Sequence, residues 1–226
     1  MSVHVGTSGW AYPTWKGTFY PEKLPQARFL EHYATRLSAC EINNTYHRMP
    51  EAATVEKWTA TVPDDFRFAV KAFRGLTPRN PSLDMLAEFL AKLEPMKERL
   101  GVVMFQFILK RDGNEDAMLR FLDAVPDSVP VALDMKHASW EDFDFPERTS
   151  LCYTDRDGGP PAKLPGGEVA YVRLRAGRYT DEQRDEWKKR LSDEGRDAFL
   201  FIKHEDTASD DHEGVLLAEW LTRELR

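Results

Sequence analysis

Eight short runs typical of β-strands recur along the chain, and segments with helical periodicity or loop composition separate them. In one of those segments, Leu83–Arg99, apolar residues follow a helical period, and Pro95 is expected to kink or shorten the helix. Strands that alternate with helices favour parallel pairing through right-handed crossovers. The strands are expected at Val3–Gly6, Ala39–Asn43, Phe66–Ala72, Gly101–Phe107, Pro130–Asp134, Thr149–Thr154, Val169–Leu174 and Ala198–Lys203.

The segments between these strands predict the fold class. The sixth unit is irregular, because Asp155–Gly167 is rich in glycine and proline, so we expect a loop there instead of a helix. Eight units in 226 residues predict an α/β protein, a single (β/α)8 TIM-like barrel over residues 1–226. An open doubly wound sheet is the alternative. Helical segments are expected at Gln26–Ser38, Ala52–Thr61, Leu83–Arg99, Glu115–Ala124, Asp181–Glu194 and Glu213–Leu225.

Four ionisable residues lie inside otherwise apolar strands: Glu41, Lys71, Asp134 and Arg173. Their apolar neighbours suit the face that packs on helices, so the charged side chains should point into the barrel. An unpaired charge buried there would cost several kcal/mol, which favours a cluster at the C-terminal rim, where barrel enzymes place their active sites. Each residue alone could equally belong to a structural ion pair.

Charge limits the ligands that such a rim would accept. The net charge of -7 argues against a protein that coats nucleic acid. Basic residues nevertheless follow several strand ends, which favours a small anion such as a phosphate or carboxylate held by arginine. These basic residues are Lys71, Arg74, Arg79, Lys110, Arg111, Arg173, Arg175 and Arg178.

Other features of the sequence concern the environment of the protein and its cofactors. We expect a cytoplasmic protein without a membrane segment, because no signal peptide and no apolar run of about 20 residues is present. Cys40 and Cys152 are expected to be buried thiols, not a disulfide. Asp134, His137 and Glu41 with His204–Asp206 offer possible metal ligands, but nearby lysine and arginine would oppose a cation, so no metal or other cofactor is expected.

The segment Gly6–Pro21 is rich in aromatic residues. Such residues could stack on a sugar or a base. We favour a loop that packs on itself above the barrel, with Trp10 as the residue most suited to contact a ligand because it lies nearest the strand end.

The chain resembles the YecE-like proteins, known as domain of unknown function 72, in five stretches: Gly6–Pro21, Glu41–Pro50, Phe66–Arg74, Val131–Trp140 and Tyr171–Leu174. The resemblance implies a TIM-like barrel without an established activity. It implies site positions at Glu41, Asn43, Lys71 and Arg173 within strands, and at Ser8, Trp10, Arg48, His137 and Trp140 in loops. The chain departs from the family pattern after Gln106, at Asp134 and Lys136, at Arg175–Gly177 and at Lys203–Asp206.

These observations predict an enzyme, a hydrolase, lyase or isomerase. Its substrate would be a small anionic or phosphorylated molecule, with a sugar-like molecule as one option. Glu41 would be the general acid or base with Lys71 as its partner, and Asp134 would be a further catalytic group. Arg173 and Arg175 would hold the anion, while Asn43 and Gln106 would orient polar groups. A metal-dependent isomerase or phosphodiesterase and a non-catalytic barrel that binds a nucleotide or nucleic acid are the alternatives. The sequence carries no signal for an oligomeric state.

Overall fold

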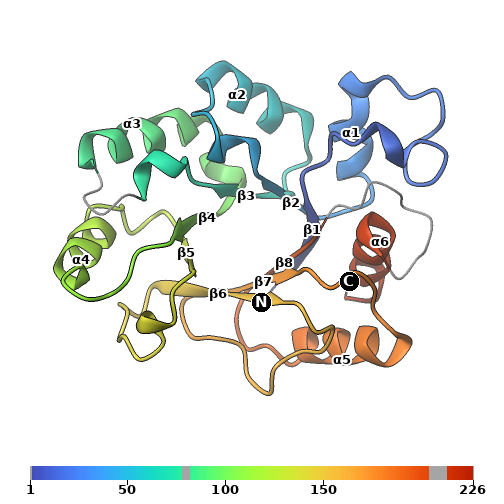
Figure 1. The fold of residues 1–226 in the computed structure, drawn as a ribbon. Coiled ribbons are helices and arrows are strands. Elements are labelled where there is room, and N and C mark those ends of the chain that lie inside the picture. The colour runs from blue at the N-terminus through green and yellow to red at the C-terminus, as the bar shows by residue number, and fades with distance from the viewer. Residues whose placement is uncertain (1, 78–81, 204–212, 226) are drawn as a thin grey trace.

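A closed barrel of eight parallel strands forms the centre of the molecule (Figure 1). The computed structural model describes residues 2–77, 82–203 and 213–225. The strands pair in chain order, and β8 closes the ring by pairing with β1. This confirms the predicted α/β barrel. The strands are β1 Val3–Ser8, β2 Ala39–Ile42, β3 Arg67–Lys71, β4 Leu100–Phe107, β5 Val131–Met135, β6 Thr149–Asp155, β7 Ala170–Leu174 and β8 Ala198–Ile202.

Helices surround most of the barrel (Figure 1). The helix expected over Leu83–Arg99 changes at Pro95: α3 ends at Leu93, and a 3-10 helix, Glu94–Arg99, follows it. The helix expected over Gln26–Ser38 is shorter. Its first residues, Gln26–Arg28, form a 3-10 helix, and the α-helix that follows ends at Ala34. The α-helices are α1 Phe29–Ala34, α2 Ala52–Thr61, α3 Leu83–Leu93, α4 Glu115–Asp123, α5 Asp181–Ser192 and α6 Gly214–Glu224.

The helical layer is interrupted beside β5 and β6, where loops replace helices between α4 and α5 (Figure 1). The predicted loop of the sixth unit is therefore confirmed. Asp155 holds the start of this loop, because its carboxylate accepts hydrogen bonds from the backbone N–H of Asp157 and Gly158 and from the hydroxyl of Tyr179.

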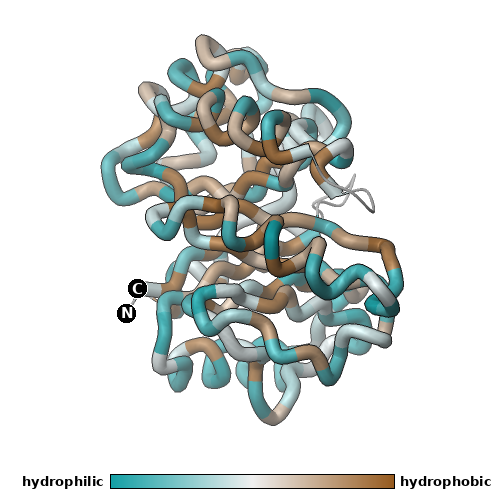
Figure 2. Tube along the Cα trace, turned by 90° about the vertical axis from the view of Figure 1, so that its left-hand side faces the viewer, coloured by the Kyte–Doolittle hydropathy of each residue, from teal (hydrophilic) through white to brown (hydrophobic). Residues whose placement is uncertain are grey.

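Apolar side chains fill the barrel and the space between barrel and helices. Figure 2 shows the most hydrophobic segments in the middle of the molecule and hydrophilic ones in the loops around it. Because side chains alternate along each strand, one set of positions forms the packed interior. Polar side chains at the next inward position of each strand therefore lie on a closed apolar base. The interior set is Ala39, Ala69, Val102, Met104, Ala132, Val169, Tyr171, Phe199 and Phe201.

The aromatic segment after β1 packs on itself, as predicted, and also against α1, which was not predicted. Trp15, Phe19 and Tyr20 are buried, and the ring of Tyr20 stacks on that of Phe29 with centroids 4.1 Å apart. None of the described helices is long and apolar enough to cross a membrane. Cys40 and Cys152 are free thiols.

Candidate functional site

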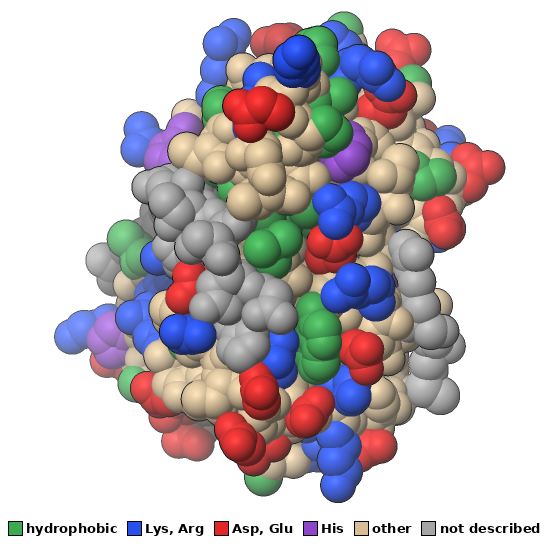
Figure 3. Space-filling view, turned by 90° about the vertical axis from the view of Figure 1, so that its right-hand side faces the viewer, with side chains coloured by type: hydrophobic (Ala, Val, Ile, Leu, Met, Phe, Trp, Pro, Cys, Tyr) green, Lys and Arg blue, Asp and Glu red, His purple; other side chains and the backbone are tan. Residues whose placement is uncertain are grey.

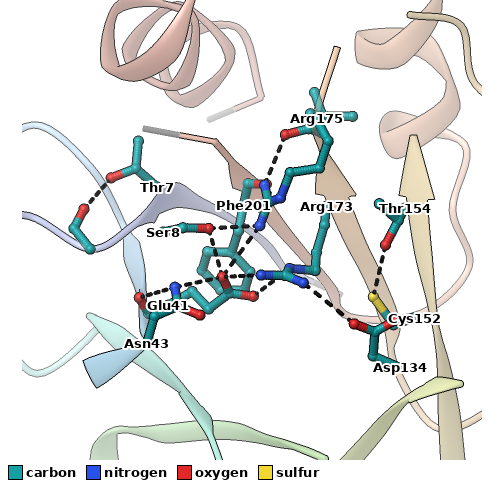
Figure 4. A network of polar contacts seen from close by, with 12 residues as sticks. Thr7, Ser8, Glu41, Asn43, Asp134, Cys152, Thr154, Arg173, Arg175 and Phe201 are labelled. Atoms are coloured by element: carbon teal, nitrogen blue, oxygen red, sulfur yellow. Dashed lines mark hydrogen bonds and ion pairs between the residues drawn. The ribbon is translucent and has the colours of Figure 1, made fainter. Parts of the chain in front are cut away.

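A charged network lies at the C-terminal end of the barrel (Figure 4). Arg173, near the end of β7, lies between the carboxylates of Glu41 on β2 and Asp134 on β5. Its Nε is 2.9 Å from Oε1 of Glu41, and its Nη1 is 3.5 Å from Oδ2 of Asp134. Three of the four charged residues predicted to converge therefore meet directly.

The Glu41 carboxylate is the centre of this network and is fully buried. Five side chains surround it, three of them from β1 and β7 and two from the positions directly after β2 and β7, so each carboxylate oxygen is well satisfied. The arrangement fixes the carboxylate in one position. The partners are Ser8 Oγ at 2.6 Å, Asn43 Nδ2 at 2.9 Å, the Tyr171 hydroxyl at 2.8 Å, Arg173 Nη2 at 3.1 Å and Arg175 Nη2 at 3.4 Å.

The surroundings of Glu41 keep it ionised. Burial alone would raise the pKa of Glu41, but Arg173 and then Arg175, helped by the hydrogen bonds from Ser8 and Asn43, hold its pKa well below the usual range. A carboxylate in this state has no proton to donate near neutral pH. The ion-pair partners of Glu41 are the two arginines, whereas the sequence analysis assigned that role to Lys71.

The depressed pKa of Glu41 predicts a specific dependence of stability on pH. The ionised form is stabilised only in the folded protein, so this contribution is complete above the pKa of an unfolded glutamate, about 4.3, and falls as pH drops below it. We expect the difference in unfolding free energy between wild type and Glu41→Gln to narrow by up to about 1.4 kcal/mol per pH unit below that point. Urea unfolding from pH 7 to pH 3 measures it. A constant difference would contradict the prediction.

Asp134 is the second buried carboxylate of the network, with 3% of the residue exposed. It accepts a hydrogen bond of 2.8 Å from Nε2 of Gln106 on β4 and forms an ion pair of 2.7 Å with Nζ of Lys136. Lys136 follows β5 directly and is exposed. Asp134 thus connects the buried arginine to a lysine at the surface.

Lys71, the last residue of β3, has a different environment from the other predicted site residues. Its Nζ lies 4.0 Å from the centroid of the Tyr46 ring, a cation–π contact. The hydroxyl of Thr45 donates to the backbone carbonyl of Lys71 at 2.7 Å, which fixes the end of the strand. Burial lowers the pKa of Lys71, and the positive charge of Arg173 lowers it further.

Most hydrogen-bond donors of the Arg175 side chain are engaged by groups of the protein itself. Its Nη1 donates to the backbone carbonyls of Leu174 and Phe201, both at 2.8 Å, and its Nη2 donates to Ser8 Oγ at 2.7 Å. With Glu41 as well, most of its donors are already used (Figure 4). Its evident role is to hold β1, β2, β7 and β8 together at the rim.

Two loop residues predicted as ligand contacts, Trp10 and Arg48, lie outside the network. Trp10 packs against Trp58 of α2, with ring centroids 5.6 Å apart, and against Phe68 on the outer face of β3. Arg48 is exposed and lines a surface hollow of about 300 Å³ together with Trp58. Neither side chain joins the Glu41 cluster, because the loops that carry them turn outward over α2.

His137 and Trp140 have structural contacts. The imidazole of His137 caps the 3-10 helix Ala138–Trp140 by accepting from the backbone N–H of Ser139. Trp140 is buried, and its indole N–H donates to the carbonyl of Leu109 at 2.9 Å. Both line a hollow of about 380 Å³ that reaches Leu133 on the outer face of β5, where the helical layer is interrupted.

The wider basic rim is partly neutralised. Arg111 forms an ion pair with Glu115, 3.5 Å apart. Over α1, α5 and α6, Figure 3 shows acidic and basic side chains intermingled. Within residues 2–77, 82–203 and 213–225, no group of three histidine, cysteine or acidic side chains could hold a metal ion. Arg79, His204, Glu205 and Asp206 lie outside the described residues.

Two members of the network, Tyr171 and Lys136, were not predicted to belong to the site. Tyr171 lies two residues before Arg173 and Lys136 two residues after Asp134. The alternation of side chains that placed Arg173 and Asp134 in the barrel places both of these on the same side. Extending that rule by one step in each direction would have found them.

Comparisons with known proteins place the chain among relatives of unknown function. A family model described as "Protein of unknown function DUF72" matches residues 4–226. The UPF0759 protein YunF of Bacillus subtilis is 27% identical over 158 residues, and the UPF0759 protein YecE of Escherichia coli K12 is 26% identical over 140 residues. These matches cover 65% and 60% of this chain but 55% and 48% of the relatives, so the chain spans about half the length of the curated relatives it matches.

Solved structures support the fold. A DUF72 family protein of Thermotoga maritima superposes with a TM-score of 0.69 at 23% identity, covering 98% of this chain and 97% of that one. A DUF72 family protein of Enterococcus faecalis gives a TM-score of 0.73 at 16% identity, covering 99% and 94%. At these identities the similarity concerns the barrel alone.

Proposed function

This chain belongs to the DUF72 family, and from that premise we propose that its barrel is an enzyme that binds a small anionic molecule at the C-terminal mouth. The charge balance of the mouth is the observation that carries the proposal. Among the residues that the structure describes, two carboxylates of the network, Glu41 and Asp134, lie near four cations, Lys71, Lys136, Arg173 and Arg175, so this set has an excess of two positive charges.

The excess charge lies toward the opening. Arg173 and Arg175 are mostly engaged with carboxylates and carbonyls, whereas Lys136 is exposed and Lys71 is partly exposed. A phosphate or carboxylate between the two lysines would neutralise them, with the guanidinium of Arg173 beneath adding attraction. Asn43 and Gln106 are half-buried beside the carboxylates, where they can orient polar groups of a ligand.

In this proposal Glu41 has the role of an anchor. It holds both arginines in fixed positions, so no reorganisation is needed when the anion arrives, and such preorganised charge is a major source of binding and catalysis in barrel enzymes. The catalytic group then has to come from the side chains that face the opening.

Binding of inorganic phosphate tests the proposal. We expect phosphate to raise the thermal unfolding midpoint, because a ligand that binds only the folded state stabilises it. Lys71→Met and Lys136→Met should each weaken the binding about tenfold, the loss of one attractive contact of roughly 1.4 kcal/mol. Calorimetric titration measures the dissociation constants.

A lysine far from the mouth provides the matched control. Lys97 lies on the 3-10 helix after α3 and pairs with Glu94 at 2.8 Å on the surface. Lys97→Met should bind phosphate as the wild type does. Equal losses in the three variants, or no binding by the wild type, would refute the mouth as the anion site.

A further inference from the structure

Lys71 is the cation of the mouth that the carboxylates do not hold. The ion pairs of Glu41 and Asp134 within the described residues are made by Arg173, Arg175 and Lys136. The described contact of the Lys71 ammonium group is with the face of the Tyr46 ring. A ring face attracts an ammonium group weakly and does not compete for the lone pair of a neutral amine.

The backbone that carries this amine is fixed at the end of β3. Lys71 follows the inward-facing Ala69 by two residues, and its carbonyl is held by Thr45. The charges that act on it come from three other strands: Arg173 and Lys136 disfavour the protonated form, and Glu41 and Asp134 favour it. Burial has the largest effect and also disfavours the protonated form, so the pKa of Lys71 is lowered. A larger fraction of neutral amine is therefore present than on a surface lysine.

We propose that Lys71 is a nucleophile that forms an imine with a small carbonyl compound bearing a phosphate or carboxylate. This deepens the proposed function and rests on it, because the anionic group of the substrate would occupy the excess positive charge beside Lys136 and Arg173 while its carbonyl carbon meets Nζ of Lys71. A lysine that is partly desolvated and next to another cation is the arrangement that activates amines for this chemistry.

The step needs no oxidant or metal. The lone pair of the neutral amine forms a C–N bond while the π pair of C=O moves to the oxygen, and one proton passes from the nitrogen to this oxygen to give a carbinolamine. The nitrogen then loses its proton, the oxygen leaves as water, and C=N forms. The net change is amine plus carbonyl compound to imine plus water. The imine withdraws electrons from the neighbouring carbon, which prepares an adjacent C–H or C–C bond for cleavage.

Reductive trapping tests the inference on the full chain. The protein is incubated with dihydroxyacetone phosphate or with pyruvate in the presence of cyanoborohydride, and peptide mass spectrometry locates the modified lysines. We expect Lys71 to be labelled about tenfold faster than Lys97 near pH 7.5, because Glu94 raises the pKa of Lys97. The two probes distinguish phosphate from carboxylate as the preferred anion, and uncharged dihydroxyacetone should label Lys71 poorly.

The pH dependence and a conservative variant separate this role from a structural one. Labelling at Lys71 should reach half of its maximum at a lower pH than labelling at Lys97. Lys71→Arg keeps the charge, so it should retain most of its inorganic-phosphate binding and lose the trapped adduct. Phosphate binding without preferential labelling of Lys71 would overturn the imine while leaving the anion site intact. Absence of both phosphate binding and labelling would overturn both proposals.

Discussion

Replacing Arg173 with methionine is expected to lower the free energy of unfolding by about 3–5 kcal/mol, because it leaves buried carboxylates without their main partner. The residue that would lose most is Glu41, whose side chain is completely inaccessible. Of its two arginine partners it would keep only Arg175, at the longer distance of 3.4 Å, together with neutral hydrogen-bond donors. Asp134 would lose a partner as well. Methionine fills a similar volume, so the loss would report charge and not a cavity. Urea unfolding followed by circular dichroism measures it.

A surface ion pair of similar geometry is the control for Arg173. Arg28 contacts Glu31 at 2.8 Å, but their side chains are 60% and 52% exposed. Water already solvates both groups, so Arg28→Met should leave the unfolding midpoint unchanged. If Arg173→Met were as stable as Arg28→Met, Arg173 would not be what keeps Glu41 ionised. The proposed excess of positive charge at the mouth would then be wrong.

Much of the site could be predicted because a parallel barrel imposes a simple rule. Side chains alternate along a strand, so a charged residue and its two apolar neighbours point to opposite faces. The apolar neighbours pack on the helices, and the charged side chain therefore points into the barrel. This rule alone predicts that Glu41, Asp134 and Arg173 point into the barrel, where their side chains do meet. The rule works because the barrel interior offers no other place where such charges can pair.

The contacts of these charges could not be predicted in the same way. Lys71 and Arg173 both satisfied the rule as partners of Glu41, and the choice between them depends on strand tilt and side-chain reach, which the sequence does not display. The directions of the loop side chains could not be predicted for a related reason. Ser8 is the last residue of β1 and Trp10 lies only two residues beyond it, yet Trp10 turns toward Trp58 and Ser8 toward Glu41.

These contacts distinguish two kinds of side chain at the mouth, those fixed in the network and those with weak contacts. A network with all of its donors engaged is rigid and costly to disturb, which suits the base of a binding site. A side chain with weak contacts can change its protonation or its partner, which suits chemistry. Glu41 and the arginines form the interlocked network, whereas the ammonium group of Lys71 contacts the ring of Tyr46.

The second large effect is expected at Gly6 on β1, although this residue has no side chain beyond a hydrogen atom. A β-carbon at this position would lie 1.8 Å from the carbonyl oxygen of Ala39 on the neighbouring strand. The obstacle is backbone, so the strands would have to separate. We expect Gly6→Ala to lower the free energy of unfolding by about 4 kcal/mol or more, among the largest effects of a single substitution. Urea unfolding is again the measurement.

Gly195 supplies the contrast, because a β-carbon there would meet no atom within 4 Å. Gly195→Ala should be neutral or stabilise by up to about 1 kcal/mol, since alanine restricts the unfolded chain. The difference between the two glycines has a consequence for the mouth. Gly6 pairs with Ala39 and Ser8 with Glu41 in the same register, so strands forced apart at Gly6 would also separate Ser8 from the carboxylate. Any Gly6→Ala protein that still folds should therefore bind phosphate more weakly, and wild-type binding in such a variant would show that the register of β1 does not position the anion site.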